Sequence, residues 1–176
     1  MPASDPVEIV DENDVFTGKV VTKRFAHDNK LPHRCAAVFV FNADGRLYVQ
    51  PHVKSNYMLD HSVGGHVDVG ETYLDAAKRE MKEEICIYNV ELEEIATSYY
   101  SFERRYIHLF GIFECIAPKN WSFHQTEEVE SLQLMTIEEI VDLMSSNPEK
   151  FTGGFINIMK KYIEVKQLPF RVEVEL

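Results

Sequence analysis

The chain has 176 residues, and its 18 lysines and arginines against 29 aspartates and glutamates give a formal net charge of −11 at pH 7. A hydrophobic share of 45% is enough to build a core, so disorder is excluded as the main state. The acidic balance argues against nucleic acid or an anionic membrane as the main partner, because both attract lysine and arginine. The length predicts one domain over residues 1–176, with a core at 34–165, a hairpin extension at 7–21 and a tail at 168–176.

Cysteine usage and the N-terminal composition indicate the compartment. The N-terminal segment is acidic and lacks the apolar stretch of a secretory signal, and no apolar run is long enough to cross a bilayer. The cysteines Cys35, Cys86 and Cys115 are widely spaced and form no Cys-x-x-Cys pair. We therefore expect reduced thiols, with Cys35 and Cys115 in the core, and a cytoplasmic protein that makes no stable contact with a membrane.

The first third of the chain is predicted to be mostly β-structure. Two β-prone runs within residues 7–21 flank a turn-forming cluster and predict a hairpin, and the polar residues 23–33 are expected to form a loop. Residues 35–42 are continuously apolar, as is typical of a strand buried on both faces. A turn then leads to a strand at 46–50, which Pro51 ends or places at an edge.

A helix is predicted at residues 72–85, after a loop through 56–60 and a short glycine-broken segment at 62–67. Leu74, Ala77 and Met81 form an apolar stripe along this helix that is expected to pack on the core.

The second half of the chain adds strands and then helices. Two β-prone runs at 91–102 and 106–116 predict a hairpin, and a strand is expected at 129–135. Thr136 and Glu139 fit a capping box that opens a helix running to about residue 145. A last helix is predicted at 154–165, and the alternating tail 170–176 is expected to add an edge strand. This order predicts an α/β fold, or α+β by a stricter definition, with helices on a mixed sheet.

Three carboxylates share one side of the 72–85 helix. Glu80, Glu83 and Glu84 lie at positions i, i+3 and i+4. Like charges at this spacing destabilise an isolated helix by roughly a few tenths of a kcal/mol per pair. They also lie towards the C-terminal end of the helix, where the helix dipole disfavours anions. Local stability does not explain them, whereas a hard divalent cation such as Mg²⁺ or Mn²⁺ does, because it prefers oxygen ligands. The competing interpretation is a solvated charged face, since Lys78 and Lys82 lie on the same helix.

The residues around this helix fit the metal-site interpretation. Glu71 and Arg79 are spaced so that an ion pair between them would fix the preceding loop against the helix. The glycines Gly64, Gly65 and Gly70 allow tight bends and a close approach of the backbone to a ligand.

Residues 65–87 resemble the Nudix box, G-x5-E-x7-R-E-U-x-E-E-x-G-U, in which U is apolar. The matching positions are Gly65, Glu71, Arg79, Glu80, Met81, Glu83, Glu84 and Ile87. Cys86 departs from the pattern, because it stands where the family has a glycine that ends the helix in a left-handed conformation, which cysteine adopts at some cost. Segments at 33–34, 59–66 and 127–130 also resemble the branch of Nudix proteins related to isopentenyl-diphosphate isomerase. The resemblance implies an α/β/α sandwich whose mixed sheet carries the box as a loop–helix–loop.

The same resemblance implies hydrolysis of a nucleoside diphosphate linked to some group X, with Mg²⁺ or Mn²⁺ as cofactor. Oxygen atoms of four residues are expected to bind the metal, namely Glu80, Glu83, Glu84 and the Gly65 carbonyl. The general base is Glu80, Glu83 or Glu128, and Arg79 with Glu71 supports the site; spacing alone does not separate these roles.

The substrate-facing residues are predicted outside the box. Arg34, His52 and Lys54 are candidates to face the phosphates, and His66 is a candidate to line the pocket, although a structural hydrogen-bonding role suits it equally. The expected partner is a small diphosphate molecule, and the N-terminal hairpin and alternating tail offer surfaces for a homodimer.

Two other functions remain open alongside the hydrolase. An isopentenyl-diphosphate isomerase would be expected to carry a cysteine just upstream of the box, and residues 60–63 contain none. A non-catalytic nucleotide-binding Nudix module would be expected to lose box carboxylates, and all of them are present. Both observations favour the hydrolase.

Overall fold

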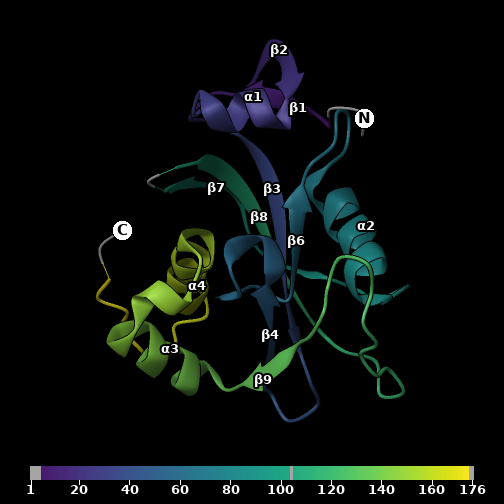
Figure 1. Ribbon diagram of the computed structural model, residues 1–176, viewed down its shortest axis with the longest axis vertical. Helices are drawn as coiled ribbons and strands as arrows, with labels where there is room; N and C mark the ends of the chain where they lie inside the picture. Colours follow the sequence, from purple (N-terminus) through teal and green to yellow (C-terminus); the bar gives the residue numbers. More distant parts are fainter. Residues whose placement is uncertain (1–4, 104, 175–176) are drawn as a thin grey trace.

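The computed structural model describes residues 5–103 and 105–174 of the chain. A mixed sheet lies between helices on its two faces (Figure 1). The helix α2 (Tyr73–Ile85) packs on one face, and α3 (Ile137–Ser146) and α4 (Gly153–Val165) pack on the other. The predicted mixed α/β architecture is therefore confirmed.

The described residues form nine strands in one sheet, with β3 at its centre. β3 pairs antiparallel with β6 and parallel with β8, and β7 and β8 form the long hairpin that the sequence predicts. β4 pairs antiparallel with β3, β5 and β9. The strand bounds are Pro6–Val10 (β1), Phe16–Thr22 (β2), His33–Phe41 (β3), Leu47–His52 (β4), Met58–Asp60 (β5), Val63–His66 (β6), Glu93–Phe102 (β7), Ile107–Ile116 (β8) and Gln133–Met135 (β9).

The apolar run of β3 separates two cores, because successive side chains of a strand point to opposite faces. Ala37 and Phe39 belong to the core beneath α3 and α4, whereas Val38 and Val40 belong to the core beneath α2. The prediction of a strand buried on both faces is thus confirmed. No helix among residues 5–103 and 105–174 is long and apolar enough to cross a membrane.

The N-terminal hairpin of β1 and β2 is present, but the expected loop after it contains a short helix, α1 (Lys23–Asp28). Thr22 caps this helix by accepting a hydrogen bond from the Phe25 N–H, and Ala26 is fully buried. Hydrophobic periodicity missed α1 because six mostly polar residues are too few to show a helical period. This hairpin and α1 form a small N-terminal layer with a core of its own at one end of the sheet, and the pairing of β1 with β3 joins it to the other strands (Figure 1).

Three further differences concern short segments. Part of the loop expected at 56–60 is the strand β5, and β4 continues through Pro51 to pair with it. The strand expected at 129–135 is only three residues long, because a turn that ends at Val129 takes up its beginning. The tail forms no strand in residues 170–174; its apolar side chains pack on the core instead, and residues 175–176 lie outside the described part.

The helices otherwise follow the sequence prediction closely. The capping box at Thr136 and Glu139 is present in α3, and α2 carries a similar box between Thr72 and Asp75. The expectation that Leu74 packs on the core is wrong: it is 38% exposed, whereas Ala76, Ala77 and Met81 are buried. Two short 3₁₀ turns, Val53–Ser55 and Pro148–Lys150, complete the structure.

Candidate functional site

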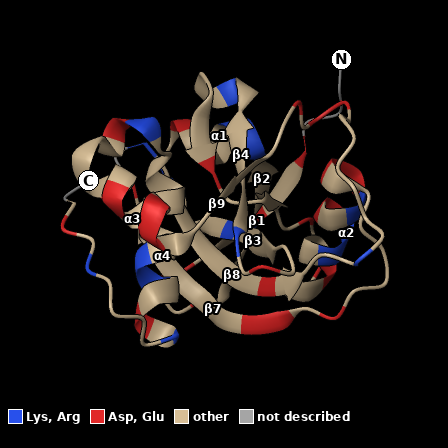
Figure 2. Ribbon diagram, turned by 90° about the horizontal axis from the view of Figure 1, so that it is seen from below, with Lys and Arg blue, Asp and Glu red and all other residues tan. Residues whose placement is uncertain are grey.

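The three predicted metal carboxylates of α2 have different surroundings. Glu80 and Glu84 are one turn apart and buried, at 7% and 6% exposure, whereas Glu83 lies on the exposed side of the helix. Glu83 accepts a hydrogen bond from Arg79 Nη1 at 3.3 Å. Residues of both charge signs follow one another along α2 (Figure 2). A purely solvated charged face would leave Glu80 and Glu84 in water, so their burial contradicts that interpretation.

Glu128 joins the two buried glutamates. One carboxylate oxygen from each of Glu80, Glu84 and Glu128 lies within 4.8 Å of the others, and we call these three residues the acidic cluster. A tight turn places Glu128 there: the Thr126 hydroxyl donates to the Glu84 carbonyl at 2.8 Å and accepts from the N–H of Val129, which is buried. The role of Thr126 was not predicted from the sequence, because the only local signal for this turn is a threonine three residues before an apolar valine.

The backbone of β6 makes room for the buried carboxylates, and Gly65 does so by lacking a side chain. A Cβ atom on Gly65 would lie 1.9 Å from Oε1 of Glu80, so this strand position admits no side chain while Glu80 is in place. The Gly64 N–H donates to Oε2 of Glu84 at 3.4 Å. The backbone of β6 therefore approaches both carboxylates closely, as expected where glycine serves a ligand site. That the Gly65 carbonyl is a metal ligand stays a prediction.

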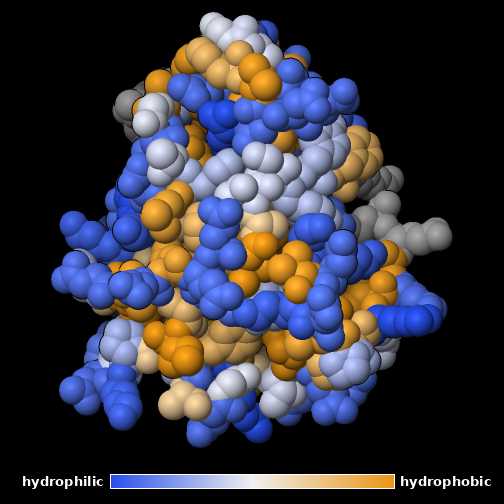
Figure 3. Space-filling view, turned by 180° about the vertical axis from the view of Figure 1, so that it is seen from behind, coloured by the Kyte–Doolittle hydropathy of each residue, from blue (hydrophilic) through white to orange (hydrophobic). Residues whose placement is uncertain are grey.

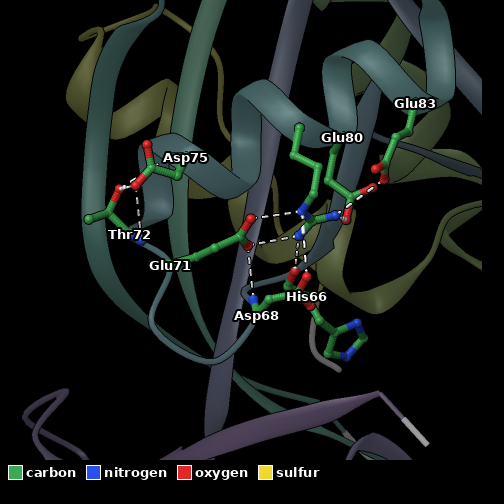
Figure 4. Close-up of polar contacts among 8 residues, drawn as sticks. His66, Asp68, Glu71, Thr72, Asp75, Glu80 and Glu83 are labelled. Carbon is green, nitrogen blue, oxygen red and sulfur yellow. Dashed lines mark hydrogen bonds and ion pairs between the residues drawn. The ribbon is translucent and has the colours of Figure 1, made fainter. Parts of the chain in front are cut away.

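Arg79 is the centre of a network that joins the glycine loop to α2 (Figure 4). Its guanidinium donates to both oxygens of Glu71, at 2.8 and 2.9 Å, so the predicted ion pair is present. It also donates to the His66 carbonyl at 2.9 Å and to Oε1 of Glu80 at 2.7 Å. The Glu71 hydrogen bond raises the pKa of Arg79, and Arg79 in turn lowers the pKa of Glu71.

The electrostatics of the acidic cluster favour a bound cation. Burial raises the pKa of Glu80 above its ordinary value. Burial, followed by the charge of Glu80, raises the pKa of Glu84 well above its ordinary value. A positive charge placed close to these carboxylates favours their ionised form. Because three carboxylates offer only oxygen donors, the cluster fits a hard cation such as Mg²⁺ or Mn²⁺.

The predicted phosphate-facing residues lie elsewhere or make no contact with the cluster. The Arg34 guanidinium is engaged by the N-terminal hairpin, with Nε 2.6 Å from Oδ1 of Asp14 and Nη1 3.2 Å from Oε2 of Glu8. Among the described residues, neither His52 nor Lys54 forms a hydrogen bond or ion pair with the acidic cluster. Burial lowers the pKa of His52, and Lys54 is exposed. Their roles toward a substrate stay predictions.

The backbone carbonyl and the ring of His66 contact different groups. Its carbonyl accepts from Arg79, but its ring points away from the arginine network (Figure 4) and packs with the rings of His27, His33 and His108. Of the four, only His66 was predicted from the sequence as a candidate site residue. They come from separate elements, so no local spacing in the sequence brings them together.

A family model described as the NUDIX domain matches residues 31–154 of this chain. Among curated proteins, an isopentenyl-diphosphate Delta-isomerase of Serratia proteamaculans is 32% identical over 167 residues, covering 86% of this chain and 88% of that protein. An uncharacterised Nudix hydrolase of Yersinia pestis is 32% identical over 140 residues, covering 76% and 74% of the two chains. The YfcD protein of Escherichia coli, also described as an uncharacterised Nudix hydrolase, is 28% identical over 180 residues, covering 99% and 96%.

Solved structures share the fold at low sequence identity. The crystal structure of DR0079 from Deinococcus radiodurans has a TM-score of 0.65 at 21% identity, covering 81% of this chain and 90% of that one. The Nudix domain of Shewanella oneidensis NrtR, solved with ADP ribose, has a TM-score of 0.57 at 12% identity, covering 82% and 98%. At these identities the likeness concerns the fold alone, and it agrees with the sandwich expected from the sequence.

Proposed function

The chain belongs to the Nudix hydrolase family, and from this premise we propose that it is a divalent-metal-dependent hydrolase that cleaves the diphosphate of a nucleoside diphosphate linked to a further group. The single observation that carries the proposal is the acidic cluster, in which two buried glutamates and Glu128 bring carboxylate oxygens within 4.8 Å of one another. The proposed partner is a small molecule, with no role for nucleic acid or a membrane.

Each residue of the site has a separate task in this proposal. Glu80 and Glu84 would hold Mg²⁺ or Mn²⁺, an ion that when bound would neutralise the diphosphate and lower the pKa of a water molecule. Arg79 holds one oxygen of Glu80 and leaves the other free, which fixes the orientation of that carboxylate. Glu71 in turn fixes Arg79.

Glu128 is the proposed proton acceptor. It is exposed on a turn, so it can reach a water molecule that attacks phosphorus, whereas Glu80 and Glu84 are enclosed by β6 and α2. Glu83 is the alternative, since it is also exposed, but its carboxylate is engaged by Arg79. A Glu128→Gln variant with normal metal binding and lost turnover would support the first assignment over the second.

The test is a phosphate-release screen with Mg²⁺ or Mn²⁺ on nucleoside di- and triphosphates, nucleotide sugars including ADP ribose, dinucleotides and prenyl diphosphates. We expect turnover of at least one nucleoside diphosphate derivative. Glu84→Gln should lower it more than about 100-fold, because loss of even an outer-sphere partner of a metal site costs about 10- to 100-fold. The matched control is Glu91→Gln, an exposed glutamate outside the site. Binding of metal and nucleotide without turnover would instead identify a binding module.

The relatives keep a second candidate open, isopentenyl-diphosphate isomerisation, because the Serratia protein carries that name. The cysteine expected of an isomerase is missing from β6, the strand beside the acidic cluster, where position 64 is glycine. Cys86 lies at the exposed end of α2. Cys35 is the thiol that pairs across from His66, but it is buried. Conversion of isopentenyl diphosphate to its allylic isomer, lost in Cys35→Ser, would favour this candidate over hydrolysis.

We also propose that the protein acts in the cytoplasm as a homodimer. All three cysteines are free thiols, which suits a reducing compartment. Val15, Phe16, Val20 and Phe25 are exposed on the N-terminal hairpin and α1, where orange residues lie at the top of Figure 3. Light scattering distinguishes the 20.4 kDa monomer from a dimer, and a Phe16→Ser variant tests whether this surface is the contact.

A further inference from the structure

Asp60 and His61 form an ion pair where β5 ends. Nδ1 of His61 lies 2.7 Å from Oδ1 of Asp60, and the same oxygen accepts the backbone N–H of His61 at 2.8 Å. Asp60 is 9% exposed, and the side chain of His61 is 14% exposed. A ring nitrogen this close to a carboxylate oxygen carries a proton, so Nδ1 is bound to Asp60 and Nε2 is the end of the ring directed away from it.

The connection that carries His61 is fixed by a buried side chain. Asp60 ends β5, and β6 begins three residues later. Between them Ser62 is fully buried, and its hydroxyl accepts from the Val40 N–H at 2.9 Å and donates to the Tyr48 carbonyl. The backbone of this connection is therefore held to β3 and β4, which gives the His61 ring a defined position.

The ring of His61 lies directly over Gly64 in β6. A Cβ atom on Gly64 would lie 1.9 Å from Nε2 of His61, so the imidazole fills the space that a side chain at this position would need. The N–H of Gly64 donates to Oε2 of Glu84 at 3.4 Å. Because both groups lie against one residue, covalent geometry limits the separation of Nε2 of His61 from Oε2 of Glu84 to about 8 Å at most.

The ion pair and the acidic cluster also interact through their charges. Burial is the main cause of the raised pKa of Glu84, and the charge of Asp60 adds to that rise after the charges of Glu80 and Glu128. Burial raises the pKa of Asp60 too, but the charge of His61 and its hydrogen bonds outweigh burial and lower that pKa. Asp60 therefore stays ionised and stabilises the cationic form of the His61 ring.

β6 separates the acidic cluster from His61. Among the strands of residues 5–103 and 105–174, β6 pairs with β3 alone, so its other edge is free of a neighbouring strand. Successive residues of a strand face opposite sides, and accordingly Gly65 faces Glu80 whereas Gly64 faces His61. A ligand that crosses the free edge of β6 would meet carboxylates on one side and the imidazole on the other.

A diphosphate bound at this edge needs positive groups in addition to a metal ion, because the acidic cluster is itself anionic. Arg79 is occupied by the carboxylates of its network, and Arg34 is held by the N-terminal hairpin. His61 is different: within the part of the chain that the structure describes, its polar contacts are both with Asp60. Its Nε2 is therefore free to bind a ligand.

The geometry points to His61 as a substrate-binding residue whose Nε2–H donates to a phosphoryl oxygen of the diphosphate, with Asp60 as the residue that positions its ring. This assignment rests on the proposed function, because it takes the ligand to be a diphosphate. A charge-assisted hydrogen bond of this kind strengthens as negative charge grows on the phosphoryl oxygens during cleavage. A buried carboxylate that orients an imidazole and stabilises its cation supports catalytic histidines in other enzymes.

The first test measures kcat and KM on the substrate that the phosphate-release screen identifies. His61→Ala should lower kcat/KM at least about tenfold, because a hydrogen bond to a charged group is lost. Asp60→Asn should lower kcat/KM in the wild-type chain but not further in His61→Ala, since it acts through the ring. The control is His124→Ala, an exposed histidine outside the site. Unchanged kcat/KM in His61→Ala, or equal losses from Asp60→Asn in both backgrounds, would overturn the assignment.

The second test needs no turnover. It follows the ¹⁵N-labelled imidazole rings of the full chain by NMR during titration with Mg²⁺ and methylenediphosphonate, which keeps the phosphoryl oxygens of a diphosphate but is not hydrolysed. The ring signals of His61, identified by their loss in His61→Ala, should shift and saturate, and those of His124 should not. Such a shift without turnover of any substrate would support the assignment and contradict the hydrolase. Absence of a saturating shift at His61 would overturn the assignment, whether or not the chain is a hydrolase.

Discussion

At the scale of single residues, the site depends on what Gly65 lacks. A methyl group there would lie 1.9 Å from Oε1 of Glu80 and would force that carboxylate out of the acidic cluster. We expect Gly65→Ala to lower metal-dependent turnover at least tenfold and stability by about 1–3 kcal/mol, the usual cost of overpacking. Enzyme assays and urea unfolding measure the two effects.

Gly45→Ala is the matched control. Gly45 has open space around its α-carbon but, unlike Gly65, a positive φ of 77°, so the alanine should cost about 1 kcal/mol of backbone strain and leave turnover unchanged. Equal losses of turnover in the two variants would show that Glu80 does not depend on the space at Gly65.

The buried Glu84 carboxylate predicts a conflict between function and stability. Its pKa is raised in the folded chain, so folding favours the protonated form, and stability falls as pH rises from the unfolded pKa, about 4.3, through the folded value. Glutamine does not titrate. Metal-free Glu84→Gln should therefore be more stable than wild type at neutral pH, and the difference should shrink towards about pH 4.

Urea unfolding of the chelated protein at several pH values checks this expectation, with Glu91→Gln as the exposed control. Adding Mg²⁺ should stabilise wild type and not Glu84→Gln. A pH-independent difference in the free energy of unfolding between Glu84→Gln and wild type would mean that burial does not disfavour the ionised Glu84 carboxylate.

At the scale of elements, the end of α2 carries a local strain. Cys86 has φ 55° and ψ 35°, the left-handed conformation, and its N–H donates to the Lys82 carbonyl. Cys86→Gly should stabilise the protein by about 1 kcal/mol, because glycine adopts this conformation without a Cβ clash. Thermal unfolding measures the gain. Cys86→Ala keeps the Cβ atom and should show none, so an equal gain in alanine would assign the effect to the thiol.

Elements with a long periodic pattern were predictable from the sequence. α2, β3 and the β7–β8 hairpin were expected within a few residues of their bounds, because each repeats its apolar pattern over eight residues or more. α1 and β5 were missed because six and three residues show no period, and they form through capping by Thr22 and pairing with β4. The apolar tail was expected as a strand, but packing on the core competes with pairing there.

The candidate site was predictable only where its residues are close in sequence. The pairing of Glu71 with Arg79 followed from spacing along one loop and helix. Glu83 and Glu84 are adjacent, yet one is exposed and the other buried, and only the packing of β6 against α2 distinguishes them. The meeting of four histidine rings from α1, β3, β6 and β8 was beyond prediction, because it depends on the register of three strands and on the position of α1.

At the scale of the whole molecule, Arg34 joins the N-terminal layer to the sheet. Its guanidinium, about one-fifth exposed, bonds Asp14 and Glu8. Arg34→Ala should lower the free energy of unfolding by about 1.5–3 kcal/mol, the range for hydrogen bonds to charged groups, with the KM for substrate unchanged. Arg24→Ala, which removes an exposed ion pair, should cost less than about 1 kcal/mol. A raised KM in Arg34→Ala would instead support the phosphate-binding role predicted from the sequence.

The strand β6 presents different groups to its two faces: Gly65 admits the Glu80 carboxylate on one, and His66 presents its ring to the other histidines on the opposite one. Inserting or deleting one residue here would exchange the two faces, so that a ring would meet Glu80 and a glycine would meet the other histidines. Evolution can therefore alter this strand by substitution but not by length. A point mutation can alter one face of β6 singly, whereas inserting or deleting one residue would disturb both faces together.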